Sequence, residues 1–162
     1  MSKKVIINVV FLVIMAITGT ALARDTYDYA GSCPQSPDKA DKWNFYTCEC
    51  TSYSADKMNE HSVKLTNYYK SVHWGNASNW INAAKSARIS YNSSPKHRDI
   101  AWWPAGSGAM KWGHVAYVES VDSKGNITVS EYNFGKKYDY GNRSIKKGSS
   151  SYPKYFIHFG AK

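Results

Sequence analysis

The sequence predicts an α+β fold, in which a short helical part is followed by several antiparallel strands. Apolar residues recur at helical spacing over residues 50–59 and 79–87. After Asp99, β-branched and aromatic residues fill several short runs, and turn residues separate these runs. A chain of this length forms a single domain with one core, because it is too short for two.

The first 23 residues have the three parts of a secretory signal peptide. Lys3 and Lys4 precede an apolar run over residues 5–17, and an A-x-A cleavage site ends at Ala23. A membrane anchor is the alternative, but the apolar run is short for a bilayer and small residues follow it. We therefore expect cleavage before Arg24 and a secreted or periplasmic protein.

The chain is strongly basic. It carries 21 Lys and Arg residues against 12 Asp and Glu residues, a formal net charge of +9. Removal of the signal peptide would take away two of the lysines and no acidic residue, so the exported domain stays cationic. Such a surface favours polyanionic partners such as cell-wall polymers, membrane surfaces or nucleic acid, and charge alone does not choose among them.

Three cysteines make an odd number in a chain that we expect to be exported, so one thiol is free or bridges to another chain. Cys48 and Cys50 are poor partners, because one residue separates them and alternate side chains diverge. The favoured disulfide joins Cys33 to Cys48 and leaves Cys50 free. The alternative pairing, Cys33 with Cys50, would occupy the thiol that begins a predicted helix.

That helix covers residues 50–59, with Cys50 in its first turn. The positive end of the helix dipole and the unpaired backbone N–H groups at this position stabilise a thiolate, so we expect a lowered pKa for Cys50. A buried and inert cysteine is the alternative interpretation.

Further elements can be placed from their spacing and turn residues. In chain order we predict a turn at 74–77, a short helix at 79–87, a brief strand at 89–91, a strand at 99–103, a glycine-rich loop at 104–108, an edge strand at 143–146 and a closing strand at 155–159.

A β-hairpin is predicted over residues 113–133, with strands at 115–121 and 127–132. The four residues from Asp122 to Gly125 supply the turn, in which Gly125 can take a positive φ. His114 stands just before the first strand, and Glu131 stands near the end of the second strand. The hairpin is either a functional site or an ordinary amphipathic hairpin.

The register of the hairpin decides whether these two side chains meet, because a one-residue slip sends every side chain to the other face. A plain loop pairs Asp122 with Asn126. A type I turn followed by a bulge pairs Val121 with Asn126 instead, and places His114 opposite Asn133. We favour the bulged register, in which the histidine and the carboxylate share one face as diagonal neighbours.

Cys50, His114 and a carboxylate or amide at Glu131 or Asn133 supply a nucleophile, a base and a group that orients the base. These residues lie in segments that resemble the CHAP domain, a papain-like family of cysteine- and histidine-dependent amidohydrolases and peptidases. In family order the segments are Cys50-Thr51-Ser52-Tyr53, Trp74-Gly75-Asn76-Ala77 with Trp80, Pro95 with Asp99-Ile100-Ala101, Gly113-His114-Val115-Ala116-Tyr117-Val118-Glu119 and Ser130-Glu131-Tyr132-Asn133.

The resemblance covers about residues 44–159, and short secreted antigens with cell-wall amidase activity are the nearest in character. We therefore divide the chain into a signal peptide at 1–23, an N-terminal extension at 24–43 and a CHAP catalytic domain at 44–162. The fold that the resemblance implies is the papain-like CHAP fold, with short N-terminal helices packed on an antiparallel β-sheet.

The resemblance also implies a role for each site residue. Cys50 is the nucleophile, His114 is the general base, and Glu131 orients His114, with Asn133 beside it. Family members often carry Gln before the nucleophile, whereas this chain has Glu49. The backbone N–H of Cys50 can still stabilise an oxyanion.

The function implied is a secreted peptidoglycan hydrolase that cleaves an amide bond, as an N-acetylmuramoyl-L-alanine amidase or a peptide-bridge endopeptidase. We expect peptidoglycan as the substrate, anionic cell-wall polymers as further partners, no nucleic acid and a monomer. The alternatives are a non-catalytic wall-binding or antigenic module with the same fold, and a secreted antibacterial toxin with the same chemistry.

Three tryptophans close to His114 in sequence, Trp102, Trp103 and Trp112, are candidate walls of a substrate groove, and core packing is the alternative for them. We expect no cofactor and no metal. The other histidines lack metal-ligand spacing, and Asp38 and Asp41 are too sparse for a calcium site.

Overall fold

The computed structural model describes residues 23–33, 39–106 and 110–162. The predicted signal peptide up to residue 22 and part of the predicted glycine-rich loop lie outside these residues. Within the described ranges, no helix is both long and apolar enough to cross a membrane.

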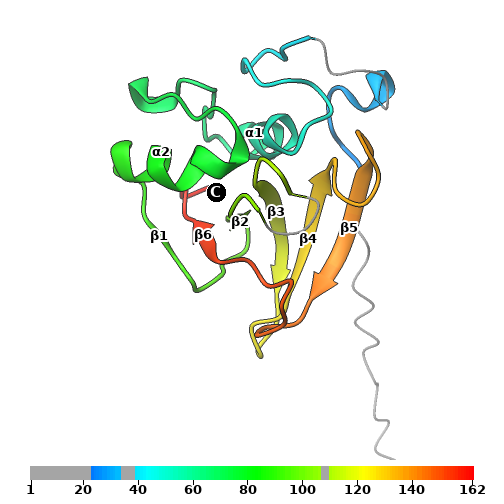
Figure 1. Ribbon diagram of the computed structural model, residues 1–162, viewed down its shortest axis with the longest axis vertical. Coiled ribbons are helices and arrows are strands. Elements are labelled where there is room, and N and C mark those ends of the chain that lie inside the picture. Colours follow the sequence, from blue (N-terminus) through cyan, green and yellow to red (C-terminus); the bar gives the residue numbers. More distant parts are fainter. Residues whose placement is uncertain (1–22, 34–38, 107–109) are drawn as a thin grey trace, which may run out of the picture.

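The described chain forms two α-helices and one six-stranded sheet, so the predicted α+β fold is confirmed (Figure 1). The sheet has the order β1-β6-β2-β3-β4-β5, and its neighbouring strands are antiparallel. The elements are α1 (Cys50–Glu60), α2 (Trp80–Ser86), β1 (Tyr91–Asn92), β2 (Ile100–Trp103), β3 (His114–Val121), β4 (Ile127–Tyr132), β5 (Tyr140–Ile145) and β6 (Tyr155–Ile157).

Figure 1 shows the helical part in cyan and green on one side of the molecule and strands β3 to β5 in yellow and orange on the other. The strand that the sequence placed at the edge is β5, which is the last strand of the sheet order. Short 3-10 turns at Ala30–Ser32, Tyr69–Ser71 and Ala77–Asn79 supplement the two helices.

Alternate residues of the strands face two separate cores, one on each side of the sheet. Val115 and Tyr117 of β3 pack with Tyr53 of α1 in the first core. Ala116 and Val118 of β3 belong to the second core. The buried members of the second core all come from strands β2 to β6.

At its turn, the hairpin of β3 and β4 does not have the favoured register. Val121 pairs with Ile127, so the prediction that it would pair with Asn126 is wrong. Gly125 does take the expected left-handed conformation, with a φ of 80°, and its N–H donates to the Asp122 carbonyl at 3.0 Å.

A bulge within the strands then shifts the register before the functional end. Val118 pairs with Val129 and Ser120 pairs with Thr128, so β3 has one extra residue between these pairs. Beyond the bulge the pairing is the one that the favoured register required. The histidine at the start of β3 and the carboxylate near the end of β4 therefore share one face, as expected.

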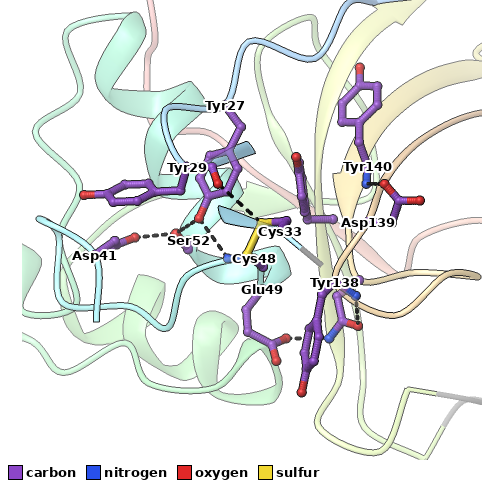
Figure 2. Close-up of a disulfide and its surroundings, with 12 residues drawn as sticks. Tyr27, Tyr29, Cys33, Asp41, Cys48, Glu49, Ser52, Tyr138, Asp139 and Tyr140 are labelled. Carbon is purple, nitrogen blue, oxygen red and sulfur yellow. Dashed lines mark hydrogen bonds between the residues drawn. A yellow bond between two sulfur atoms is a disulfide. The ribbon is translucent and has the colours of Figure 1, made fainter. Parts of the chain in front are cut away.

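The segment before α1 packs against the rest of the domain. Tyr27 is buried, its hydroxyl lies 2.5 Å from Ser52 Oγ, and it accepts a bond of 3.0 Å from the Cys48 backbone N–H. A disulfide joins Cys33 to Cys48, with 5.8 Å between their Cα atoms. Figure 2 shows this disulfide beside Tyr27 and Ser52, so the segment helps to hold the start of α1.

Candidate active site

Cys50 occupies the first position of α1 and is the free cysteine of the described chain. The residue is 8% exposed, and its thiol hydrogen bonds with the backbone of Val115 and Thr51. Val115 directly follows His114, so the helix start and the start of β3 meet at the sulfur. The Cys33–Cys48 bond is the favoured connectivity, and it leaves Cys50 able to react.

The thiol of Cys50 does not have the lowered pKa that its helix position predicts. Burial raises its pKa to about 12, and the backbone bonds from Val115 and Thr51 only partly offset this rise. The charges of Glu49 and Glu131 raise the pKa further. The expectation of a lowered pKa is therefore wrong, because the cost of desolvating a thiolate exceeds the gain from the helix terminus.

His114 begins β3 and is buried against aromatic rings. Its Nε2 lies 2.8 Å from Oε2 of Glu131, and both side chains are almost completely buried. The ring centroid of His114 is 5.0 Å from that of Phe134 and 5.5 Å from that of Trp103. Because Glu131 holds Nε2, Nδ1 is the nitrogen left for proton exchange with a substrate or a thiol.

Arg143 of β5 bonds to the carboxylate of the His114–Glu131 pair. The sequence indicates this arginine only as part of an edge strand. Its Nε donates to Glu131 Oε1 at 2.6 Å, and its Nη2 donates to Oε2 at 3.1 Å. The guanidinium carbon lies 3.9 Å from the ring centroid of Phe134 and 4.9 Å from that of Trp103. Two aromatic rings and a bidentate bond therefore hold the guanidinium in one orientation.

The pKa of the Glu131 carboxyl is lowered. Burial alone would raise it, but the hydrogen bonds from His114 and Arg143 and their charges outweigh the burial. Gly141 lies directly opposite Glu131 on β5, and a Cβ at this position would lie 3.7 Å from the Glu131 Cγ, an ordinary van der Waals contact. Glu131 is therefore an ionised group held between two nitrogen donors.

Asn133, the second candidate for orienting His114, bonds to other groups. It has a left-handed φ of 58°, and its Nδ2 donates to Glu49 Oε2 at 2.6 Å. Its Oδ1 accepts from the Tyr138 backbone N–H at 3.0 Å. Glu131 thus contacts the histidine, whereas Asn133 links the end of β4 to the residue before Cys50; the Glu49 end of this bond is visible in Figure 2.

Gly113 sets the position of His114. It has a φ of 75°, and a Cβ at this position would lie 2.7 Å from the Ser78 backbone nitrogen and 3.0 Å from the Trp103 carbonyl oxygen. The Ser78 N–H donates to the Trp112 carbonyl at 2.8 Å. Only glycine allows the chain to pass this close before the histidine.

A pocket of about 290 Å³ joins the predicted site residues. Cys50, His114 and Asn133 line it, with Glu49 and Trp112. Glu131 is not among the residues that line this pocket, and it bonds to His114, which does line it. This arrangement suits a positioning role.

The three candidate groove tryptophans have different surroundings. Trp112 is 61% exposed and lines the pocket. Trp102 and Trp103 are buried in the cores, and their Nε1 atoms donate to the carbonyls of Ala77 and Ser151 at 2.7 Å and 2.9 Å. The prediction that they form the walls of a substrate groove is therefore wrong for Trp102 and Trp103, because their strand β2 is central in the sheet and has cores on both sides.

Among the residues that the structure describes, no group of three or more His, Cys, Asp or Glu side chains could hold a metal ion. The site instead offers a thiol, an imidazole and a paired carboxylate. This set can perform nucleophilic and acid–base chemistry on an acyl carbon.

An α+β domain with a thiol at a helix start, in one pocket with a histidine from an antiparallel sheet, has the arrangement of a papain-like domain. The model of the CHAP domain family matches residues 40–133, which is more than half of the chain. The chain belongs to the CHAP domain family, and the resemblance drawn from its motifs is confirmed.

Two curated relatives are secretory antigens of Staphylococcus aureus strain NCTC 8325. Staphylococcal secretory antigen ssaA2 is 43% identical over 93 residues, which cover 57% of this chain and 30% of that protein. Staphylococcal secretory antigen SsaA is 42% identical over 93 residues, with 57% and 32% covered. The matched region therefore spans about a third of the length of these relatives.

Solved structures share the fold. An N-acetylmuramoyl-L-alanine amidase from Staphylococcus aureus aligns with a TM-score of 0.63 and 27% identity, over 81% of this chain and 36% of that one. The structure of Ly7917 aligns with a TM-score of 0.50 and 19% identity, over 68% of this chain and 53% of that one. The second likeness concerns the fold alone.

Proposed function

We propose that this protein is a secreted peptidoglycan hydrolase that cleaves an amide bond through the thiol of Cys50. The observation that carries the proposal is the contact of His114 Nε2 with Glu131 at 2.8 Å, at the wall of a pocket that Cys50 also lines. A buried histidine–carboxylate pair beside a free thiol is the arrangement that cysteine nucleophiles need. Membership of the CHAP family and the amidase among the structural neighbours support the same chemistry.

The proposed reaction begins with proton transfer from the Cys50 thiol to Nδ1 of His114 as the sulfur attacks the amide carbon. Backbone N–H groups at the start of α1 stabilise the oxyanion. His114 then returns the proton to the leaving amine, and a thioester remains on Cys50. Water attacks the thioester with His114 as the base, which releases the carboxylic acid and restores the thiol.

The raised pKa of Cys50 shapes the first step. The thiol rests protonated at neutral pH, because burial raises its pKa to about 12. Proton transfer to His114 then accompanies the attack and does not precede it. Glu131 stabilises the imidazolium that forms, and the bonds from Arg143 keep this carboxylate ionised and in place.

The amide cleaved is the bond between the lactyl group of a muramic sugar and the first stem residue, or a bond in the peptide bridge. The stem peptides carry free carboxylates, which suit a cationic exported domain that keeps 19 Lys and Arg residues against 12 Asp and Glu residues, a formal net charge of +7. The amidase among the structural neighbours favours the lactyl amide. The predicted signal peptide and the relatives that are named secretory antigens support export.

The test is digestion of purified cell wall with the protein that begins at Arg24 and with its Cys50→Ala variant. Mass spectrometry of the fragments then identifies the new termini. We expect a free lactyl carboxyl group or a new peptide terminus with the unaltered protein and intact wall with Cys50→Ala. Equal digestion by both proteins would exclude the proposed nucleophile.

The burial of Cys50 favours one second candidate, a wall-binding module that retains the fold without catalysis. A thiol reagent of small size distinguishes the two functions. Modification of Cys50 that is blocked by added peptidoglycan fragments, together with loss of digestion, agrees with an enzyme. A thiol that stays unmodified in the folded protein, with wall binding intact, agrees with the module.

A further inference from the structure

A second groove continues from the reaction pocket, between the segment that precedes α1 and the loop that follows it. Its volume is about 570 Å³, within the range that bound small molecules occupy. The groove shares Tyr46, Thr51 and Asn76 with the pocket that Cys50 and His114 line. A substrate whose amide reaches Cys50 can therefore extend directly into this second groove.

Exposed aromatic rings line the groove. Tyr46 and Tyr68 are 62% and 61% exposed, although such large rings are usually buried for the most part. The ring of Tyr68 stacks on His73 with a centroid distance of 5.0 Å and an interplanar angle of 21°. His73 in turn lies against Gly75, where a Cβ would be 3.4 Å from the imidazole.

The backbone between Tyr68 and His73 is strained. Lys70 and Ser71 both have left-handed conformations, with φ values of 52° and 58°, and residues with a Cβ rarely adopt them. Strain of this kind persists where the surrounding structure imposes it, and it clusters at ligand sites. The strained pair folds the loop back, so that the stacked rings lie at the groove.

Asn67 hydrogen bonds to residues on both walls of the groove. Its Nδ2 donates to the Asn44 carbonyl at 2.9 Å, and its Oδ1 accepts from the Gly75 N–H at 2.7 Å. Its backbone N–H donates to the Trp43 carbonyl at 2.9 Å. The groove is therefore preformed, which lowers the entropy cost of binding.

The groove differs in charge from the reaction pocket. Lys111 and Glu49 line the pocket, whereas none of the described residues that line the groove is Lys, Arg, Asp or Glu. These four types make up 20% of the chain. The polar groups of the groove are amides, hydroxyls and the imidazole of His73, which can hydrogen bond to an uncharged polar ligand without an ion pair.

We propose that this groove binds the glycan strand of peptidoglycan, with a pyranose ring against Tyr68 and its N-acetyl group toward the asparagines. A pyranose ring has an apolar C–H face that packs on an aromatic ring, and its neutral hydroxyl and acetamido groups match the amides of the groove. A stem peptide fits less well, because its carboxylates would find no cation there. The inference rests on the proposed function, which makes peptidoglycan the substrate.

The test measures saccharide binding apart from hydrolysis. A tetramer of N-acetylglucosamine is titrated into the Cys50→Ala protein by calorimetry, and the titration is repeated with Tyr68→Ala and Tyr68→Phe added. We expect saturable binding that Tyr68→Ala weakens about five- to tenfold and Tyr68→Phe largely retains, since the ring makes the contact. Tyr91→Ala is the matched control, because Tyr91 packs on Tyr155 and lines neither site.

The outcomes separate this inference from the proposed function. Saturable binding of a stem pentapeptide that Tyr68→Ala weakens, with no binding of the sugar tetramer, would overturn the glycan assignment. Digestion of cell wall by a protein that does not bind the tetramer would also overturn it and leave the proposed function intact. Binding through Tyr68 by a protein that digests no cell wall would support the groove and refute the hydrolase.

Discussion

The pKa values of the buried groups on the two sides of the reaction pocket shift in opposite directions. On the helical side, Cys50 has a free thiol, and burial raises its pKa to about 12. On the sheet side, Glu131 is as deeply buried, yet bonds from His114 and Arg143 lower its pKa. Burial alone therefore does not decide the charge of a group, because hydrogen bonds from ionised or polar partners can outweigh it.

The difference suits the proposed chemistry. A thiol that stays neutral is protected from solvent reagents and loses its proton only when a substrate is attacked. A carboxylate that stays ionised keeps the histidine ready to accept that proton.

The largest effect is expected for Glu131→Gln, which removes the charge that faces His114. We expect hydrolysis to fall by about 10²- to 10⁴-fold, because the histidine loses its orienting anion. Wall digestion rates measure the loss, and circular dichroism checks that the fold is retained. Glu119→Gln is the control, since this carboxylate belongs to the same hairpin and bonds to Ser130; an equal loss there would remove the special role of Glu131.

Gly113→Ala should displace the histidine from the thiol. The new Cβ would lie 2.7 Å from the Ser78 nitrogen at a φ of 75°, and a shift of about 1 Å in a catalytic group costs on the order of 10² in rate. Thermal unfolding should also show a loss of about 1–3 kcal/mol.

Gly148→Ala is the matched variant for this position. Gly148 has a φ of 81°, no atom within 4 Å of its Cβ position and no place in the lining of the pocket, so we expect only the backbone cost of about 1–2 kcal/mol. Full activity of Gly113→Ala would contradict the close approach that we describe.

Arg143→Gln tests the second nitrogen donor of Glu131. We expect a loss of activity of about tenfold. One charge-assisted bond to a buried carboxylate contributes roughly 1.5–3 kcal/mol, and only part of this free energy stabilises the transition state. Lys146→Gln, an exposed cation next to the end of the same strand, should leave the rate unchanged.

The pH dependence of Arg143→Gln has a defined sign. The folded-state pKa of Glu131 is lowered by His114 and Arg143, so the stability it contributes is present above the unfolded pKa and is lost as pH falls through the folded pKa. Removing Arg143 raises the folded pKa, so activity and stability should both decline at a higher pH than in the unaltered protein. If the acid limb of the pH–activity profile did not shift in Arg143→Gln, the coupling of Arg143 to the pKa of Glu131 would be refuted.

The smallest effect concerns the helical side. Glu49 raises the pKa of Cys50 through its charge, so Glu49→Gln should lower that pKa and speed alkylation of the thiol by about two- to fivefold at mildly alkaline pH. Glu60→Gln, at the far end of α1, should not change the rate. A slower reaction with Glu49→Gln would show that the Asn133 bond matters more than the charge.

Local patterns in the sequence determined much of this protein. The start of α1 at Cys50, the strands of the hairpin, the edge position of β5 and the Cys33–Cys48 pairing all depend on short-range spacing and turn residues. Helical and strand periods act within a few residues, so a single sequence reveals them.

Other features depend on which distant segments meet, and only the tertiary structure decided them. The bulge near Glu119 restores the register that brings His114 to Glu131, and the pairing of β4 with β5 brings Arg143 to the same carboxylate. The raised pKa of Cys50 arises in the same way. The helix terminus is visible in the sequence, but burial depends on all the elements packed around the thiol, and here its effect is the larger.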